Sequence, residues 1–154
     1  MKAYYKSPIG LIRIESSEKG ISGLIFLDTI EDEVNGMNEI ASRCCIQLDE
    51  YFNHKRERFD LELDLKGTEF QQKIWHELLN IPFGKTISYK KLSHRHGDLK
   101  AIRAVAAANG ANPVSIIVPC HRVIGSDGSL TGYAGGLWRK KWLLDHESRD
   151  LRLL

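Results

Sequence analysis

Three short runs at the start of the chain have the character of strands, at residues 2–6, 11–15 and 21–27, and in the second of them apolar residues alternate with others at 12 and 14. Turn-forming residues separate these runs, at 7–10 and 18–20. Because successive side chains of a strand point to opposite faces, a period of two is typical of strands with one buried face. The pattern therefore predicts a small antiparallel sheet with its other face in water.

A helical pattern follows, in which apolar residues recur at steps of three and four between Asn38 and Phe52. Such a stripe predicts an amphipathic helix that covers the sheet. Cys44 falls on the apolar stripe and Cys45 on its flank. The acidic residues before this helix, at 29–37, are interrupted by a glycine and are expected to form a loop.

Residues 59–65 alternate strictly between apolar and charged side chains, which predicts either a further strand or an extended linker. Gly67 separates this segment from a region with a different, helical pattern. We therefore expect two domains, an N-terminal α/β domain at 1–67 and a C-terminal domain at 68–154.

Helix start and stop signals organise the second half of the chain. Three helices are expected, each after a residue that can cap it: Thr68 before 69–79, Ser88 before 89–94, and Asp98 before 99–108. Gly97 would end the second of them, and two short helices joined by a glycine-containing turn fit a helix-turn-helix. A last helix is expected at 137–147, with four apolar residues directed to packing surfaces: Leu137, Trp138, Trp142 and Leu144.

The second helix of this helix-turn-helix is unusually thin because much of it is alanine: Ala101, Ala104, Ala106, Ala107 and Ala108. Two interpretations are open from the residues alone. A thin helix can pack tightly inside a protein core. It can also press into a groove of a ligand such as DNA, with Arg103 as its one long side chain.

A candidate nucleophile follows a short β-branched run. Residues 116–118 suit a short buried strand, and Pro119 would end it because proline has no N–H for a ladder. Cys120 would then lie on the following turn, beside the imidazole of His121 and the cation of Arg122. These neighbours could favour the thiolate, the form of cysteine that attacks electrophiles.

The string Pro119-Cys120-His121-Arg122-Val123 resembles the active-site motif of the O6-alkylguanine-DNA alkyltransferases, also called methylated-DNA–protein-cysteine methyltransferases. The resemblance continues through further blocks in family order: Phe70, Gly84, Ser88-Tyr89, Arg103-Ala104-Val105, Asn112-Pro113-Val114, Gly132-Tyr133-Ala134-Gly135-Gly136 and residues 142–147. Several ordered blocks at family-like spacing are more specific than any one motif.

The resemblance implies an α+β protein. The N-terminal domain would be a small antiparallel sheet with a covering helix, ribonuclease H-like, and the C-terminal domain would be helical, with a winged-helix-like helix-turn-helix. It implies DNA repair by direct reversal, in which the alkyl group of O6-alkylguanine, and of O4-alkylthymine, passes irreversibly to Cys120 after base flipping. The implied partner is alkylated double-stranded DNA, bound through the minor groove by a monomer without a cofactor.

Roles for individual residues follow from the same resemblance. Cys120 would be the alkyl acceptor, and His121, held by Glu147, would take the thiol proton through a water. Tyr89 would press on a phosphate and donate a proton to the guanine oxygen. The DNA-binding set would be Ser88, Tyr89, Arg103, Ala104, Gly110 and Arg122.

Asn112 would be structural and bridge the turn ahead of Cys120. The base pocket would be framed by Asn109, Val118, Tyr133, Ala134 and Gly135. Ala134 stands where some relatives carry a hydroxyl residue, and Asn109 where they carry a larger apolar one. These departures predict a pocket that tolerates groups larger than methyl.

Charge is divided unevenly along the chain, although the net charge is only +2. Residues 1–67 hold 9 Lys or Arg against 13 Asp or Glu, and residues 68–154 hold 13 against 7. Between 85 and 122 there are seven basic residues and one acidic residue, Asp98. A basic half of this kind is the electrostatic pattern of a protein that binds a phosphate backbone.

The three cysteines give neither a disulfide framework nor the spacing of a zinc site, and reduced thiols fit a cytoplasmic protein. We therefore expect no metal. His94 and His96 point to different faces of a helix, so they are a poor metal pair. No apolar run approaches the roughly 20 residues of a membrane span, and residues 1–6 do not resemble a signal peptide.

Three other functions remain open from the sequence. A cysteine hydrolase could use Cys120, His121 and Glu147, and would turn over without duplex DNA. A damage sensor could flip alkylguanine without repairing it, although the alkyltransferase-like proteins that do so lack the cysteine. A helix-turn-helix regulator is disfavoured, because an alanine-rich helix offers few side chains to base edges.

Overall fold

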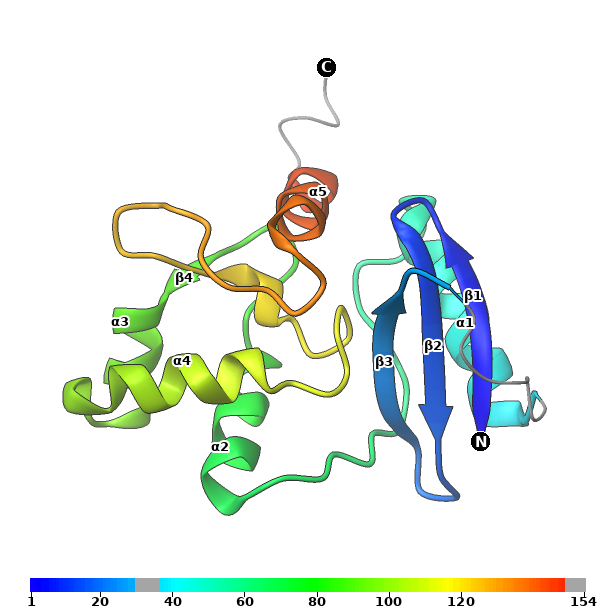
Figure 1. Cartoon of the computed structure of the whole chain (residues 1–154), viewed down its shortest axis with the longest axis horizontal. Coiled ribbons are helices and arrows are strands. Elements are labelled where there is room, and N and C mark those ends of the chain that lie inside the picture. Colours follow the sequence, from blue (N-terminus) through cyan, green and yellow to red (C-terminus); the bar gives the residue numbers. More distant parts are fainter. Residues whose placement is uncertain (30–36, 149–154) are drawn as a thin grey trace. The chain divides into compact units, whose positions relative to one another are not determined.

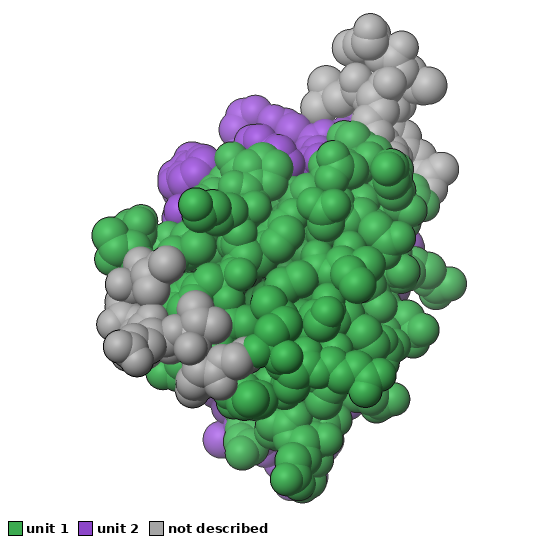
Figure 2. All heavy atoms as spheres, turned by 90° about the vertical axis from the view of Figure 1, so that its right-hand side faces the viewer, with its two compact units in different colours: residues 1–66 green, residues 67–154 purple. Residues whose placement is uncertain are grey.

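The computed structural model describes residues 1–29 and 37–148, so most of the loop expected at 29–37 lies outside the described residues. The chain divides into two compact units, Met1–Lys66 and Gly67–Leu154 (Figure 2). Each unit has its own secondary structure and its own core, and each is described separately below.

The first unit is a three-stranded antiparallel sheet in the order β1-β2-β3, formed by β1 (Lys2–Ser7), β2 (Gly10–Ser16) and β3 (Ile21–Leu27). Helix α1 (Glu39–Phe52) lies against one face of the sheet (Figure 1). Asn38 caps α1 through its side-chain oxygen, which accepts from the backbone N–H of Ala41 at 2.7 Å. The predicted strands and covering helix are confirmed.

The core of this unit collects the inward residues of the alternating pattern, with α1 closing over them: Ile12, Ile14, Ile21, Leu24, Leu48 and Tyr51. Cys44 is buried and Cys45 half-buried, as the helical stripe predicts. Residues 59–65 are an extended segment and not a full strand, because their only bridge in the described parts joins Leu63 to Ile21. Of the two alternatives, the linker is the better description.

The second unit is helical, with α2 (Glu69–Leu78), α3 (Tyr89–His96), α4 (Ile102–Gly110) and α5 (Leu137–Glu147) (Figure 1). A 3₁₀ turn, η1 (Leu99–Ala101), precedes α4. A two-stranded parallel ladder pairs β4 (Ile87–Ser88) with β5 (Val123–Ile124). Trp75 of α2 is buried and donates from its indole N–H to the carbonyl of Ala108 at 2.8 Å, which fixes α2 against α4.

The predicted caps explain where these helices begin. Thr68 makes a capping box with Gln71 at the start of α2. Ser88 accepts from the N–H of Lys91 at the start of α3, and Gly97, with φ of 99°, ends that helix in the left-handed region. Asp98 accepts from the N–H of Lys100, but it caps η1, and α4 proper runs two residues beyond the predicted end.

Two expectations are wrong. Residues 116–118 are not a strand: Ile116 has a φ of 73°, and the N–H groups of Ile117 and Val118 bond to the nearby carbonyls of Ser115 and Val114. Those turn bonds use the groups that a ladder would need. In α5, Leu137 and Trp138 are exposed and do not pack into the unit, because the buried face is the one that carries Lys140, Leu143 and Glu147.

Candidate active site

Cys120 begins a single 3₁₀ turn, η2 (Cys120–Arg122), directly after Pro119. It is only 6% exposed. Its backbone N–H donates to the carbonyl of Val118 at 2.8 Å, and its carbonyl accepts from the side-chain amide of Asn109 at 3.3 Å. The backbone on both sides of the sulfur is therefore held in place by hydrogen bonds.

Asn112 braces the turn that precedes the cysteine. Its Nδ2 donates to the carbonyl of Val118 at 2.7 Å, and its Oδ1 accepts from the N–H of Val114 at 3.0 Å. The structural bridge expected of Asn112 is thus present in the geometry. The carbonyl of Val118, which is expected to frame the base pocket, accepts both from Asn112 and from the N–H of Cys120.

A buried ion-pair network lies beside the cysteine. His121 donates from Nε2 to the carboxylate of Glu147 at 2.8 Å, since a carboxylate can only accept. Arg122 binds both carboxylate oxygens, from Nε at 2.8 Å and Nη2 at 2.9 Å, and its Nη1 donates to the carbonyl of Ile81 at 2.6 Å. This two-point pairing is the strong form of an arginine–carboxylate interaction.

The network fixes the state of its members. Burial by itself would raise the pKa of Glu147, but the interactions of its carboxylate with His121 and Arg122 outweigh burial and hold that pKa well below its usual value. Glu147 is therefore ionised at neutral pH. With Nε2 bonded to the carboxylate, Nδ1 of His121 is the remaining basic atom, and it is buried without a hydrogen-bond partner in the described parts of the chain.

Arg122 lies differently from the sequence expectation. It was expected to contact DNA, yet it is buried, and its guanidinium is bonded to Glu147 and Ile81. Phe83 also covers it, with the guanidinium carbon 5.9 Å from the ring centre. Arg122 in this structure orients Glu147 and does not face outward.

Lys140 of α5 is the cation whose charge lowers the pKa of Cys120, a role that the sequence did not predict. Burial raises the pKa of the Cys120 thiol, while the Asn112 amide and the Lys140 ammonium act in the opposite direction. Lys140 is fully buried and donates from Nζ to three carbonyls, those of Val123 at 2.6 Å, Thr131 at 2.9 Å and Gly132 at 3.3 Å. The resting cysteine is therefore a thiol, and the charge of Lys140 favours its thiolate.

One signal in the sequence points to Lys140. Residues three, four and seven positions apart share a helix face. Once Glu147 is assigned to the inner face of α5, Leu143 and Lys140 follow on the same face, and all three are buried. A buried lysine in this register is a candidate functional charge and not a solvated one.

Tyr89 opens α3 and connects the cysteine region to the surface. Its hydroxyl donates to the carbonyl of Thr131 at 3.1 Å and accepts from Nδ2 of Asn109 at 3.4 Å. The ammonium of Lys140 lies 5.7 Å from its ring centre. Burial raises the pKa of Tyr89, so the phenol keeps its proton at neutral pH.

A cavity of about 430 Å³ opens outside these tyrosine contacts, within the size range of ligand pockets. Helices α3 and α4 and the segment after β5 supply its lining: Tyr89, Ile102, Arg103, Ala106, Gly110, Thr131, Gly132 and Tyr133. Burial raises the pKa of Tyr133 well above its usual value, and the neighbouring Cys120 raises it further. Asn109 links this wall to the cysteine, because its Nδ2 donates both to the Tyr89 hydroxyl at 3.4 Å and to the Cys120 carbonyl at 3.3 Å.

The remaining residues predicted from the sequence are those expected to bind DNA and those expected to frame the base pocket. Arg103, Ala104 and Gly110 are exposed on α4, and Arg103 and Gly110 line the cavity. Ser88 is occupied as the cap of α3. Ala134 is exposed and Gly135 half-buried, and like Asn109 and Val118 they are outside the cavity lining.

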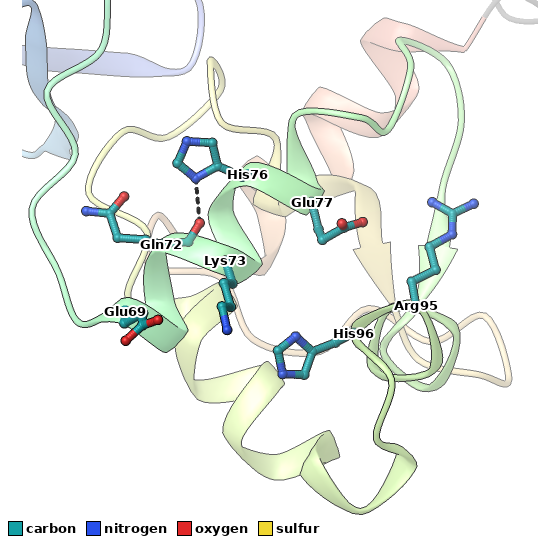
Figure 3. A pocket seen from close by; sticks show the side chains of 7 residues that line it. All are labelled: Glu69, Gln72, Lys73, His76, Glu77, Arg95 and His96. Carbon is teal, nitrogen blue, oxygen red and sulfur yellow. Dashed lines mark hydrogen bonds between the residues drawn. The ribbon is translucent and has the colours of Figure 1, made fainter.

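A second hollow of about 500 Å³ lies between α2 and α3 (Figure 3), and Cys120 is not among the residues that line it. Its side chains carry both charge signs: Glu69, Gln72, Lys73, His76, Glu77, Arg95 and His96. His76 donates from Nδ1 to the carbonyl of Gln72 at 2.6 Å within its own helix. The hollow contains no thiol, so we place the chemistry at Cys120.

No cluster of three or more His, Cys, Asp or Glu residues suited to a metal ion occurs in the described ranges 1–29 and 37–148. Within the same ranges, no helix combines the length and apolar character that crossing a membrane requires.

Comparison with known proteins gives a consistent result over the chain. Residues 69–149 match the family described as 6-O-methylguanine DNA methyltransferase, DNA binding domain, and residues 1–65 match its ribonuclease-like domain. The methylated-DNA–protein-cysteine methyltransferase of Methanosarcina barkeri is 45% identical over 96% of each chain. That of Mycolicibacterium paratuberculosis is 45% identical over 93% of this chain and 89% of its own.

Solved structures agree with the sequence matches. The crystal structure of the Mycobacterium tuberculosis O6-methylguanine methyltransferase superposes with a TM-score of 0.84, at 42% identity over 99% of each chain. The Mycobacterium tuberculosis OGT protein in complex with DNA gives a TM-score of 0.83, at 42% identity over 97% of this chain and 98% of its own. The chain belongs to the 6-O-methylguanine DNA methyltransferase family.

Proposed function

We propose that this protein repairs DNA by transferring the alkyl group of O6-alkylguanine irreversibly to Cys120. The observation that carries the proposal is the position of Cys120. It directly precedes His121 and Arg122 of the buried network with Glu147, and Asn109 links its carbonyl to Tyr89 in the lining of an open cavity. A thiol so placed can be deprotonated from within the protein and approached from outside it.

The proposed step is a displacement at saturated carbon. Nδ1 of His121 receives the thiol proton, directly or through water, and the ionised Glu147 stabilises the imidazolium that forms. The sulfur attacks the alkyl carbon, a new S–C bond forms, and the C–O6 bond of the base breaks. The electron pair of that bond goes to O6, which then takes up a proton.

Tyr89 is the proposed proton donor to O6. Its phenol is protonated, lines the cavity and now donates to the carbonyl of Thr131 at 3.1 Å, a bond it can exchange for one to the leaving oxygen. Lys140 stabilises negative charge as it moves from sulfur to the base, because its positive charge acts on Cys120 and its ammonium lies 5.7 Å from the centre of the Tyr89 ring. Asn109 links Tyr89 to the Cys120 carbonyl and keeps the two aligned.

The proposed ligand is double-stranded DNA, bound through its minor groove by a monomer. Helix α4 presents small exposed residues there, among them Ala104 and Gly110, which let the helix axis come close to the groove. Arg103 lines the cavity and would occupy the gap in the stack that the flipped nucleotide leaves. O4-alkylthymine offers the same alkyl–oxygen bond and is a further proposed substrate.

The two domains have separate proposed roles. Residues 68–154 hold the helix-turn-helix, the cavity and Cys120, and form the DNA-binding and alkyl-acceptor domain. The N-terminal α/β domain, 1–67, contributes no residue to the site described above. A thioether product has no return path to a thiol in this machinery, so each molecule reacts once.

Intact-protein mass spectrometry tests the proposal after mixing with a duplex that carries one O6-methylguanine. We expect the protein to gain one CH₂, because methyl replaces the thiol hydrogen, and peptide mapping to locate it on Cys120. The Cys120→Ser variant and undamaged DNA should give no gain. A damage sensor would bind the duplex without gaining mass, and a cysteine hydrolase would release product and return to its original mass.

A further inference from the structure

The exposed face of α4 is not uniformly small. Ile102, its first residue, is 37% exposed, and Leu99 of η1 is 49% exposed. The exposed residues that follow on the helix are alanines, apart from Arg103 and Gly110. The expectation that Arg103 is the one long side chain of this face is therefore incomplete, since a branched apolar side chain stands directly beside it.

Ile102 belongs to the wall of the 430 Å³ cavity, together with Arg103 and Tyr89. Ile102, Ala106 and Gly110 follow at four-residue steps and form one stripe along that wall. The stripe is bulky at the start of α4 and flat at its end. A ligand lying along it meets an apolar projection at one end and the bare backbone at the other.

Ile102 does not belong to the core of the unit. The residue of α4 that anchors the helix in the core is Val105, which is fully buried, while Ile102 faces outward. An apolar side chain in water gains free energy when a ligand covers it. Among the proposed contacts of this helix, the face of a base pair, exposed when a base step opens, is such an apolar surface.

We infer that Ile102 is a wedge that enters the minor groove beside the damaged nucleotide and holds the neighbouring base pair apart while that nucleotide is flipped. Minor-groove proteins use isoleucine and similar side chains in this way, to unstack a base step and stabilise the opened duplex. The inference rests on the proposed function. Two adjacent side chains then have different roles: Arg103 occupies the gap that the flipped nucleotide leaves, and Ile102 inserts at the neighbouring base step.

The wedge has a distinctive consequence, because it assists only the opening of a stacked duplex. It should contribute nothing to alkyl transfer from a substrate that is already unstacked. The test therefore compares single-turnover rates on three substrates: a fully paired duplex with O6-methylguanine, the same lesion in a single strand, and the free base O6-benzylguanine.

For Ile102→Ala we expect a loss of roughly fivefold to tenfold on the paired duplex and less than about twofold on the single strand and free base. Ile102→Leu should restore most of the duplex rate, because it keeps the apolar volume. Leu99→Ala is the matched control: Leu99 is an exposed apolar residue of the preceding turn but does not line the cavity. Its duplex rate should stay within about twofold of the original.

Several outcomes would overturn the wedge. Equal losses of transfer rate on all three substrates in Ile102→Ala would indicate damage to the site. An unchanged rate on the duplex would show that the Ile102 side chain does not help to open it. A duplex-specific loss in Leu99→Ala as large as in Ile102→Ala would replace a wedge with a general apolar contact. Failure of the underlying function looks different, since the unaltered protein would then transfer no alkyl group from any substrate.

Discussion

The surroundings of Cys120 and the outer face of α4 belong to the same unit but are built in opposite ways. Around Cys120, charged side chains are buried and held by hydrogen bonds: His121 and Arg122 both bind Glu147, and Lys140 donates to backbone carbonyls. The face of α4 is exposed and made mostly of small residues. The surroundings of Cys120 thus keep a reactive group in one position and protonation state, whereas the face of α4 offers a surface on which a large partner can lie.

This division predicts which substitutions affect stability and which affect only the reaction. A change near Cys120 should destabilise the fold and slow transfer together, because buried charges lose their partners. A change on α4 should leave stability intact, since its side chains have few contacts to lose. Substitutions in the two regions therefore test this contrast, and the largest effect is expected at Glu147.

Glu147→Ala should destabilise the protein by about 3 to 5 kcal/mol, because it leaves Arg122 and His121 buried without their carboxylate. It should also slow transfer by roughly a hundredfold or more, as His121 loses the group that orients it. Chemical denaturation and a single-turnover rate measure the two effects. Glu147→Gln is the control that keeps the volume, and it should recover part of the stability but little of the rate.

Acid should weaken the fold through the same residue. The pKa of Glu147 is depressed in the folded state, so its contribution to stability is complete above the unfolded pKa of about 4.3 and is lost as the pH falls below it. Denaturation midpoints measured between pH 7 and pH 3 should fall in the original protein by more than in Glu147→Gln. Parallel curves for the two proteins would mean that the carboxylate is not held by its neighbours.

Lys140→Met should slow transfer by roughly tenfold, because it removes the buried cation that favours the Cys120 thiolate. Without this cation the pKa of the Cys120 thiol should rise further. The alkylation rate of the thiol should therefore reach a given value only at a higher pH in Lys140→Met than in the original protein. Lys141→Met is a matched control on the exposed side of α5. An unchanged pH profile in Lys140→Met would remove Lys140 from the site.

Arg103→Ala should slow transfer from duplex DNA by about tenfold and leave the free base O6-benzylguanine unaffected. Its free energy of unfolding should stay within about 0.5 kcal/mol of the original, because the side chain is exposed. Rates on both substrates and a denaturation curve give the comparison. A loss of stability here would erase the contrast between the two regions.

Local signals in the sequence were enough to place the elements. Thr68, Ser88 and Asp98 each bond to the backbone within three residues, so the starts of α2, α3 and η1 are decided by neighbours in the chain. The three strands of the sheet were predicted in the same way, from short runs at 2–6, 11–15 and 21–27 that turn-forming residues separate. The pairing of His121 with Glu147 followed from resemblance to a family and not from local pattern.

The rest depends on contacts between distant residues. Ile116 takes a left-handed conformation because the turn before Cys120 is braced by Asn112, and β-branched composition gives no hint of this. Lys140 looks like one of several surface lysines until the carbonyls of Val123, Thr131 and Gly132 surround it. The inward turn of Arg122 likewise follows from the position of Glu147, which is 25 residues away along the chain.

The most direct test of the whole account is the amount of methyl transferred per molecule of protein when methylated duplex is in excess, with the modified residue located by peptide mapping. We predict that the transfer stops at one methyl per protein and that all of it is on the sulfur of Cys120. Continued transfer past one equivalent, or a methyl group on Cys44 or Cys45, would contradict the account.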